Sequence, residues 1–345
     1  MTGEATVPTT RVSVVILAYG RDPWLERCVV SVLASTGVEV DVILVDNTGT
    51  DETVDRLGKR AGVRVVRPGR NLGFAGGCNL GASLAGGDVI ALVNQDAVVD
   101  PGALERLARV ASRSDVGVAT GSIRLAHAPE RLNSGGNAVH FLGFGWSGSF
   151  DEPAADHSVE VDVTGASGAG MAMRRAQWER FGGFADEYIA YHEDAELSLR
   201  CWQQGLRVVY VPDAVVTHRY EFSRNPSKYY LVERNRLLFC LTVFERRTLA
   251  LLAPALVGLE LGMVAVAIHG RWLRQKIAGW RWILERRRWV VARRRLLQAE
   301  RTRSDRELAH LLAGRFDARN LPLPPALRPL DRVLAAYWSI VRRLL

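Results

Sequence analysis

The chain has 345 residues, enough for one large domain or two ordinary ones. Its composition, 48% hydrophobic and 24% charged, is that of a globular protein and excludes disorder over most of its length. The net charge of +8 is concentrated in residues 271–303, where twelve Lys or Arg stand against two Glu, a local balance of +10. A basic block after an apolar run indicates a membrane surface, whereas uniform basicity would indicate nucleic acid. We therefore expect an anionic membrane surface as a partner, and no nucleic acid.

The cysteines and the N-terminus bear on the compartment. Four cysteines are scattered along the chain without CxxC spacing, at Cys28, Cys78, Cys201 and Cys240. This pattern predicts neither a zinc site nor a disulfide framework and fits a reducing cytosol. The first residues, MTGEATVPTTR, contain no apolar run, so no signal peptide is predicted.

The first hundred residues alternate between strand and helix patterns. Residues 12–18 form an apolar, β-branched run, typical of a strand buried on both faces. Asp22-Pro23 then predicts the start of a helix that continues to about Leu33. Further strands are expected at 40–45, 63–66 and 88–93, and further helices after 51, 73 and 100. This βαβαβ order predicts an α/β protein with a doubly wound, mostly parallel sheet.

Polar residues follow each of the four strands. They are Tyr19 and Arg21, Asp46 and Asn47, Arg70 and Asn71, and Asn94 and Asp96. In doubly wound sheets, ligands bind beyond the carboxyl ends of the strands, so these side chains define the expected binding site. The first strand-to-helix turn lacks GxGxxG, and the chain has no P-loop motif, which argues against a dinucleotide-dependent dehydrogenase and an NTPase.

Two aspartates at strand ends are suited to binding a nucleoside diphosphate. Asp96 can reach a divalent cation that bridges the diphosphate, because Mg²⁺ and Mn²⁺ prefer oxygen ligands and neutralise charge on a leaving group. Asp46 can accept a hydrogen bond from the ring N–H of uracil or thymine. Each aspartate is explained equally well by the turn that follows its strand.

The stretch HEDAELSLR, residues 192–200, places three acids at the start of a helical pattern. These acids, Glu193, Asp194 and Glu196, can complement the helix dipole, or one of them can act as general base for an acceptor hydroxyl. His218 ends a strand predicted over 208–217 and is either a metal ligand or a structural histidine.

Six segments taken together resemble the family 2 glycosyltransferases with the GT-A fold. They are VSVVILAYGR, DVILVDNTGTDET, RNLGFAGGCNLG, ALVNQDAVV, GAGMAMRRAQWERFGGFADEYIAYHEDAELSLR and VPDAVVTHR, and they cover roughly residues 10–220. The resemblance implies a GT-A catalytic domain over 1–245, with a nucleotide-sugar half at about 10–100 and an acceptor half at about 101–220. A helical, basic, membrane-associating region would follow over 246–345.

The resemblance also implies roles for single residues. Asp194 would be the catalytic base, with Glu193 beside it. Asn94-Gln95-Asp96 stands where the family has its DxD-type motif, so coordination of Mn²⁺ or Mg²⁺ would depend on Asp96, together with His218. The donor would be bound by residues at the other strand ends, namely Tyr19, Arg21, Asp46, Arg70, Asn71, Gly73 and Asn94.

The implied reaction is an inverting transfer of a sugar from a nucleoside diphosphate to a hydroxyl of a glycan or polyprenyl-linked acceptor. NLGFAGGCNLG, the NQD variant and GGNAVHFLGFGW are similar to the rhamnosyltransferase-like branch that builds bacterial cell-envelope polysaccharides. That branch implies dTDP-rhamnose as the donor, with a UDP-hexose or UDP-galactofuranose next.

Two other functions are alternatives to sugar transfer. A nucleotidyltransferase would need a Gly-rich, basic loop after the first strand, which AYGRDPW does not provide. A catalytically silent sugar-nucleotide or polysaccharide-binding module stays open because Asn94 replaces an acid of the DxD-type motif. A homo-oligomeric state is also left open.

Residues 249–268 are apolar and long enough to span a membrane. Pro254 and Gly258 weaken such a helix, and Glu260 near its centre would cost about 2–3 kcal/mol in lipid. A single crossing would also export the basic block, against the positive-inside tendency. We therefore expect a helix in the cytoplasmic leaflet, followed by a basic helix with several Trp residues on the membrane surface. A core or subunit-interface helix is the alternative.

Overall fold

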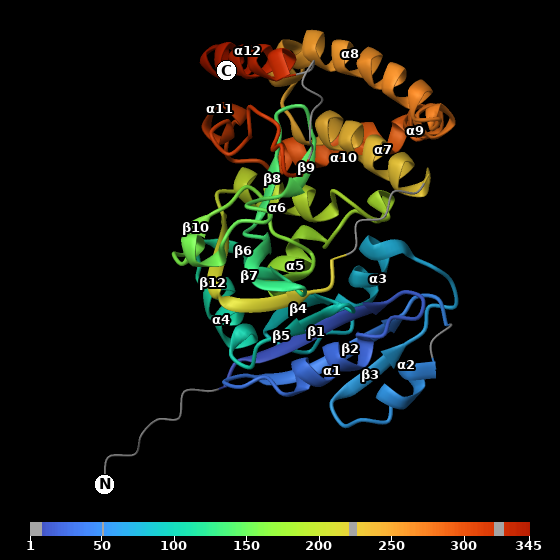
Figure 1. The fold of residues 1–345 in the computed structure, drawn as a ribbon, viewed down its shortest axis with the longest axis vertical. Coiled ribbons are helices and arrows are strands. Elements are labelled where there is room, and N and C mark those ends of the chain that lie inside the picture. The colour runs from blue at the N-terminus through green and yellow to red at the C-terminus, as the bar shows by residue number, and fades with distance from the viewer. Residues whose placement is uncertain (1–8, 50–51, 221–225, 321–327) are drawn as a thin grey trace.

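The computed structural model describes residues 9–49, 52–220, 226–320 and 328–345 (Figure 1). Its centre is a ten-stranded mixed sheet whose main path runs β10-β12-β6-β11-β4-β1-β2-β3, with β5 and β7 paired at its sides. Most neighbouring strands along the nucleotide half are parallel, which confirms the predicted α/β class and the doubly wound sheet.

The N-terminal half of the sheet has the predicted βαβαβ order. Its parallel strands are β1 (Arg11–Ala18), β2 (Glu39–Asp46), β3 (Val63–Val66) and β4 (Val89–Asn94). The helices between them are α1 (Leu25–Leu33), α2 (Glu52–Leu57) and α3 (Gly73–Ala82). Helix α1 begins two residues later than predicted, because the Asp22 carboxylate accepts the Trp24 N–H at 2.8 Å and forms a turn before the helix.

The second half of the sheet adds antiparallel strands. Its elements are β5 (Ala97–Val99), α4 (Ala103–Ala111), β6 (Val116–Leu125), β7 (Ala128–Ser134), β8 (Asn137–Val139), β9 (Gly145–Ser147), β10 (Val161–Asp162), β11 (Gly170–Arg174), α5 (Arg175–Phe181), α6 (Glu193–Gln203) and β12 (Arg207–His218). Strand β11 runs antiparallel between β4 and β6, and β8 and β9 form a separate hairpin. Short 3-10 turns lie at Ala154–His157 and Asp186–Tyr188.

The core lies on both faces of the sheet because β1 and β4 are buried along almost their whole length. Alternate residues of β1 point to opposite sides: Val14 and Ile16 join one cluster, and Val15 and Leu17 join the other. This burial on both faces explains why these strands read as continuous apolar runs rather than alternating ones.

The C-terminal region is helical, as predicted. It consists of α7 (Pro226–Val243), α8 (Arg246–His269), α9 (Leu273–Glu285), α10 (Arg287–Glu300), α11 (Asp305–Leu308) and α12 (Arg328–Leu344). Helix α7 packs on α9 and α10, so the predicted boundary at residue 245 falls inside a packed helical group. That boundary stays a prediction.

Helix α8 is the one helix among the described residues that is long and apolar enough to cross a membrane. Its Glu260, however, faces the protein. The Glu260 carboxylate pairs with Arg236, with Lys276 at 2.9 Å and with the Trp280 indole N–H at 2.7 Å, and Lys276 also contacts Glu233 at 2.7 Å. This buried ion cluster is balanced, with two acids and two bases, and it attaches α8 to α7 and α9.

The tryptophans of the basic segment contact neighbouring helices, and the placement of this segment on a membrane surface stays a prediction. Trp272 is buried and stacks on Tyr229 with ring centroids 5.1 Å apart. Trp282 lies under the Arg234 guanidinium at 4.4 Å. These rings face inward because they fill the space between α7 and α9, while the arginines between them stay exposed.

Candidate active site

The ends of β1, β2 and β4 meet at one edge of the sheet, as predicted. Ala18 pairs with Asp46, and Leu17 pairs with Asn94, so the polar residues that follow these strands become neighbours. The Gln95 side chain strengthens this edge, because its amide donates to Tyr19 O at 3.0 Å and accepts the Tyr19 N–H at 2.8 Å. Gln95 thus continues the β1–β4 pairing by one residue, a role that was not predicted.

Asp46 is buried and held by its own turn and by an arginine. Its Oδ1 accepts the Gly49 N–H at 2.7 Å, and its Oδ2 accepts Arg67 Nε at 3.2 Å. The turn explanation is therefore correct, and each oxygen keeps a second lone pair for a ligand. Tyr19, 59% exposed, and the exposed Arg21 and Arg70 lie at the rim of this edge.

Asn47 organises the loop expected to lie along the nucleotide, a function that sequence reasoning missed. The buried Asn47 amide donates to Asn71 Oδ1 at 2.9 Å and to Gly73 O at 3.3 Å, and its Oδ1 accepts the Leu72 N–H at 2.8 Å. Gly73 has φ +72°, and a Cβ there would lie 2.7 Å from Ile189 Cγ2, so only glycine fits. The only sequence signal for Asn47 was its place directly after Asp46.

Asp96 and His218 come together although they are far apart in the chain. Strand β5 pairs antiparallel with the end of β12, opposing Ala97 to His218. His218 Nε2 then lies 3.2 Å from Asp96 Oδ1 and 3.4 Å from Asn94 Nδ2. On its other side, His218 Nδ1 lies 2.9 Å from Oδ1 of the buried Asn133. Asn133 was not predicted as a site residue.

These contacts decide which histidine nitrogen faces the site. If Nδ1–H donates to the Asn133 carbonyl oxygen, Nε2 carries the lone pair and accepts the Asn94 amide. That single lone pair can either accept the Asn94 amide hydrogen or, in place of that bond, bind a cation together with the neighbouring Asp96 carboxylate. Oxygen and imidazole nitrogen suit a divalent ion. Among the described residues no group of three or more His, Cys, Asp or Glu forms a closed metal site, so the remaining ligands would come from substrate or water.

Asp194 lies in the first turn of α6. Its Oδ2 accepts Asn137 Nδ2 at 3.0 Å and the Gly168 N–H at 3.2 Å, and its Oδ1 accepts the Ala195 N–H at 2.7 Å. Burial raises the pKa of Asp194, and these hydrogen bonds oppose that rise. A carboxylate with an upward-shifted pKa and fixed geometry is suited to accept a proton.

The other two acids of this stretch differ from Asp194. Glu193 is buried, and burial together with the Asp194 charge raises its pKa, so the negative charge of the pair resides on Asp194. Glu196 is fully buried between Arg200 at 2.9 Å and Arg293 at 2.5 Å. Glu196 is therefore a structural ion-pair residue that attaches α10 to α6, and it does not serve as an alternative base.

One loop contacts both Asp194 and Asn94. Residues 167–169 precede β11; the Gly168 N–H binds Asp194, and Ala169 O accepts the Asn94 N–H at 3.3 Å. The base and the Asn94–His218 pair therefore flank the same three residues.

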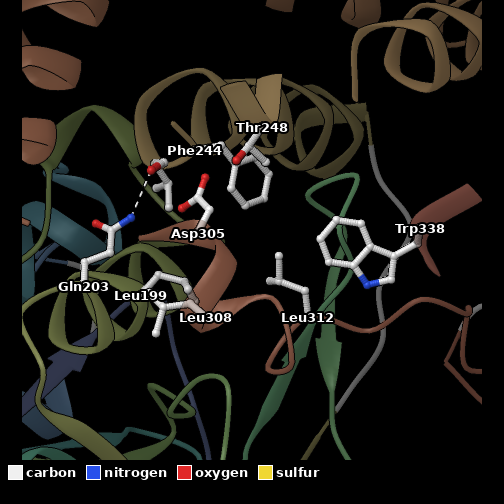
Figure 2. A pocket seen from close by; sticks show the side chains of 9 residues that line it. Leu199, Gln203, Phe244, Thr248, Asp305, Leu308, Leu312 and Trp338 are labelled. Atoms are coloured by element: carbon white, nitrogen blue, oxygen red, sulfur yellow. Dashed lines mark hydrogen bonds between the residues drawn. The ribbon is translucent and has the colours of Figure 1, made fainter. Parts of the chain in front are cut away.

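A small cavity elsewhere, drawn in Figure 2, is lined by the end of α6 and by C-terminal helices. It is a packing gap outside this site, because it contains none of the predicted site residues.

The arrangement is that of a GT-A glycosyltransferase. Similar solved structures are GalNAc-T7 with UDP, GalNAc and Mn²⁺ (TM-score 0.59, 20% identity, 71% of this chain and 50% of that chain) and the mannosyltransferase PcManGT of Pyrobaculum calidifontis with GDP-Man and Mn²⁺ (0.52, 16%, 97% and 86%). The chain thus spans half the length of the first structure. At these identities the likeness shows the fold alone.

The sequence comparisons define the family. The model described as Glycosyl transferase family 2 matches residues 13–181. The N-acetylglucosaminyl-diphospho-decaprenol L-rhamnosyltransferase of Mycobacterium tuberculosis is 29% identical over 245 residues, covering 63% of this chain and 79% of the relative. The O-antigen biosynthesis protein RfbC of Myxococcus xanthus is 28% identical over 63% of this chain and 18% of its own length. The chain belongs to the family 2 glycosyltransferases, in their rhamnosyltransferase-like branch.

Proposed function

We propose that this glycosyltransferase transfers a sugar, with inversion, from a nucleoside diphosphate to a hydroxyl of a glycan or lipid-linked acceptor. The observation that carries the proposal is the loop 167–169, which binds Asp194 on one side and Asn94 on the other. A base and a diphosphate site held by one loop satisfy the alignment that an in-line displacement needs.

In this mechanism Asp194 removes the proton of the acceptor hydroxyl. The acceptor oxygen forms a bond to C1 of the sugar while the bond from C1 to the diphosphate oxygen breaks, so the configuration at C1 inverts. Asn137, Gly168 and Ala195 keep the carboxylate oriented through their hydrogen bonds. A divalent ion, Mn²⁺ or Mg²⁺, held by Asp96 and His218 would neutralise charge on the leaving diphosphate.

We favour dTDP-rhamnose as the donor, with a UDP-sugar next. The relative from M. tuberculosis named as an L-rhamnosyltransferase supports this choice. Thymine and uracil both offer a ring N–H that the free lone pairs of Asp46 can accept. Tyr19, Arg21 and Arg70 would contact the base, ribose and diphosphate from the rim, and Asn71 and Gly73 would follow the nucleotide.

We further propose that the acceptor is attached to a polyprenyl lipid and that the enzyme works at the cytoplasmic face of a membrane. The name of the M. tuberculosis relative includes a decaprenol-linked acceptor. The exposed residues of α8 between 250 and 268 are all uncharged: Ala250, Ala253, Pro254, Val257, Gly258, Leu261, Gly262, Ala265, Val266 and Ile268. An exposed apolar helix face of this length is typical of a surface that enters an interface or a membrane.

Helix α12 extends the same surface. Figure 1 shows α8 and α12 side by side at the end of the molecule opposite α1 and α2, and the two helices are in contact. The exposed apolar residues of α12 follow helical spacing: Leu330, Val333, Ile340 and Leu344. Since Glu260 is paired inside the protein, α8 would lie in one leaflet and not cross the bilayer. The exposed arginines at both ends of α8, Arg246, Arg247, Arg271 and Arg274, suit anionic headgroups.

A donor screen tests the proposed reaction. Purified full-length protein would receive dTDP-rhamnose, UDP-hexoses or UDP-galactofuranose with Mn²⁺ or Mg²⁺, and nucleoside diphosphate release would be measured with and without a polyprenyl-diphosphate-linked sugar. Acceptor-dependent release with one donor is expected. Donor binding without turnover under every condition would instead identify a silent binding module, the function that Asn94 leaves open.

A further inference from the structure

The residues directly before the proposed base form a strained turn. Ile189, Tyr191 and His192 all have a positive φ, of 64°, 70° and 71°. Such values are disfavoured for β-branched and bulky residues. The turn therefore needs contacts from outside itself to keep this path, and those contacts come from α7.

Asn235 supplies three of these contacts from a single side chain. It is fully buried, and its amide nitrogen lies 2.9 Å from Tyr188 O, 2.8 Å from Ala190 O and 2.7 Å from Tyr191 O. An amide group has two hydrogens, so one of them is shared between two carbonyls. A buried donor that joins three carbonyls of one turn determines the path of that turn.

Arg234 holds Asn235 in the orientation that these contacts need. Arg234 Nε and Nη2 donate to Asn235 Oδ1 at 2.9 and 2.7 Å, so the amide nitrogen must face the turn. The same Nη2 reaches Glu187 O at 2.6 Å and Tyr188 O at 3.0 Å. The guanidinium is itself fixed over the Trp282 ring of α9.

The turn contacts both halves of the active site. At one end it leads through His192, whose Nε2 lies 2.8 Å from Gly143 O, into Asp194. In its middle, Ile189 O accepts the Ala75 N–H at 3.0 Å in the first turn of α3, and Gly73 packs against the Ile189 side chain. A shift of the turn would therefore move the base and the nucleotide loop together.

We infer that Asn235 is a positioning residue for transfer, acting through the turn 187–192 on both Asp194 and the loop at Gly73. This inference rests on the proposed role of Asp194 as base. It assigns to α7 a function that no motif in the catalytic segments indicated, since Asn235 lies outside all of them.

The test compares two variants with one matched control. Asn235→Ala removes the amide, and Asn235→Asp keeps the size and the acceptor for Arg234 but removes the donors. Gln203→Met is the control, because the buried Gln203 amide also donates to a carbonyl of α7, Val243 O at 2.9 Å (Figure 2). Val243 is the last residue of α7, so this contact does not involve the turn. Amide hydrogen exchange of a peptide covering 187–195 and steady-state kinetics would be measured on all three and on the parent protein.

Faster exchange in 187–195 is expected in both Asn235 variants and not in Gln203→Met. Turnover should fall on the order of 10- to 100-fold in both, with a smaller change in donor KM, because misplacement of a base lowers kcat. Unchanged exchange, or a kcat within about twofold of the control, would overturn the inference. If the parent protein transfers no sugar, the proposed function fails, while the exchange data still decide whether Asn235 holds the turn.

Discussion

His218 Nε2 lies 3.2 Å from Asp96 Oδ1, although 122 residues separate the two in the chain. The contact exists because β5 turns back from β4 and pairs with the last residues of β12. On the far side of the ring, Nδ1 lies 2.9 Å from Asn133 Oδ1, and in the tautomer that donates from Nδ1 to this oxygen the Nε2 lone pair faces the site. We propose that His218 and Asp96 hold a divalent cation, and this proposal can be tested through Asn133.

Removing Asn133 should weaken metal use without removing a ligand. In Asn133→Leu, Nδ1 loses its acceptor, so the ring is no longer held in the tautomer and orientation that present Nε2. Loss of such a partner typically costs 10- to 100-fold in metal affinity. The Mn²⁺ concentration for half-maximal transfer should therefore rise by about that factor, measured by titration at saturating donor. An unchanged Mn²⁺ titration would contradict this arrangement.

Asp194→Asn should keep donor binding and lose transfer. The amide has nearly the shape of the carboxylate but cannot accept a proton, and general-base catalysis typically contributes 10²- to 10⁴-fold. We expect a fall in kcat of that order, with nucleoside diphosphate binding by calorimetry unchanged. Transfer at the parent rate would move the base to Glu193, since Glu196 is occupied by Arg200 and Arg293.

The fall in activity at low pH should reflect protonation of Asp194. Burial raises the pKa of Asp194 above its usual value of 3.8, and the base acts only when deprotonated. Activity should therefore fall as the pH drops, and the fall should begin at a higher pH than for an exposed aspartate. A kcat/KM profile that stays flat below pH 4 would contradict this assignment.

Stability should also fall in acid because of His140. Burial lowers the pKa of His140 from 6.5 to about 3. Between these two pH values the His140 side chain is protonated in the unfolded chain and neutral in the folded protein. The contribution of His140 to the free energy of unfolding is fully present above pH 6.5. It falls by about 3–5 kcal/mol as the pH drops toward 3. His140→Phe keeps the stacking on Phe316, whose ring centroid lies 4.3 Å away, and should flatten the urea-unfolding free energy between pH 7 and 4. Equal pH dependence in both proteins would exclude His140 as the cause.

The apolar surface of α8 and α12 predicts binding to anionic membranes. Full-length protein should float with vesicles that contain phosphatidylglycerol. Leu261 is 69% exposed, and Leu261→Glu together with Val257→Glu should abolish flotation, because both charges would enter lipid. The exposed Glu179→Ala on α5 is the control and should float like the parent. If the parent protein does not bind the vesicles but forms dimers that the double variant does not form, the apolar surface of α8 and α12 is a subunit interface.

Some of this site could be read directly from the chain. Residues 12–18 and 89–93 are apolar except for Ser13, so they had to be buried strands, and the polar residues after them had to gather at the carboxyl edge of the sheet. Local order along the chain is enough for that inference, because parallel neighbours align their ends. The resemblance of the short motifs then indicated the family and the roles of Asp96 and Asp194.

Other relationships depended on packing between segments that are distant in the chain. The sequence does not distinguish the roles of Glu193, Asp194 and Glu196. The ion pair with Arg293 of α10, which lies far away in the chain, shows that Glu196 is structural. The tryptophans of the basic segment face inward because α7 offers them a surface, which no periodicity reveals. The same holds for Asn47, Asn133 and Asn235, whose amides bind backbone or side-chain groups brought near by tertiary contacts. The sequence by itself determined which strands are buried and which polar residues gather at the carboxyl edge of the sheet, since both follow from local pattern. The tertiary structure alone decided which polar groups hold the others in place, because hydrogen-bond partners are chosen by distance in space.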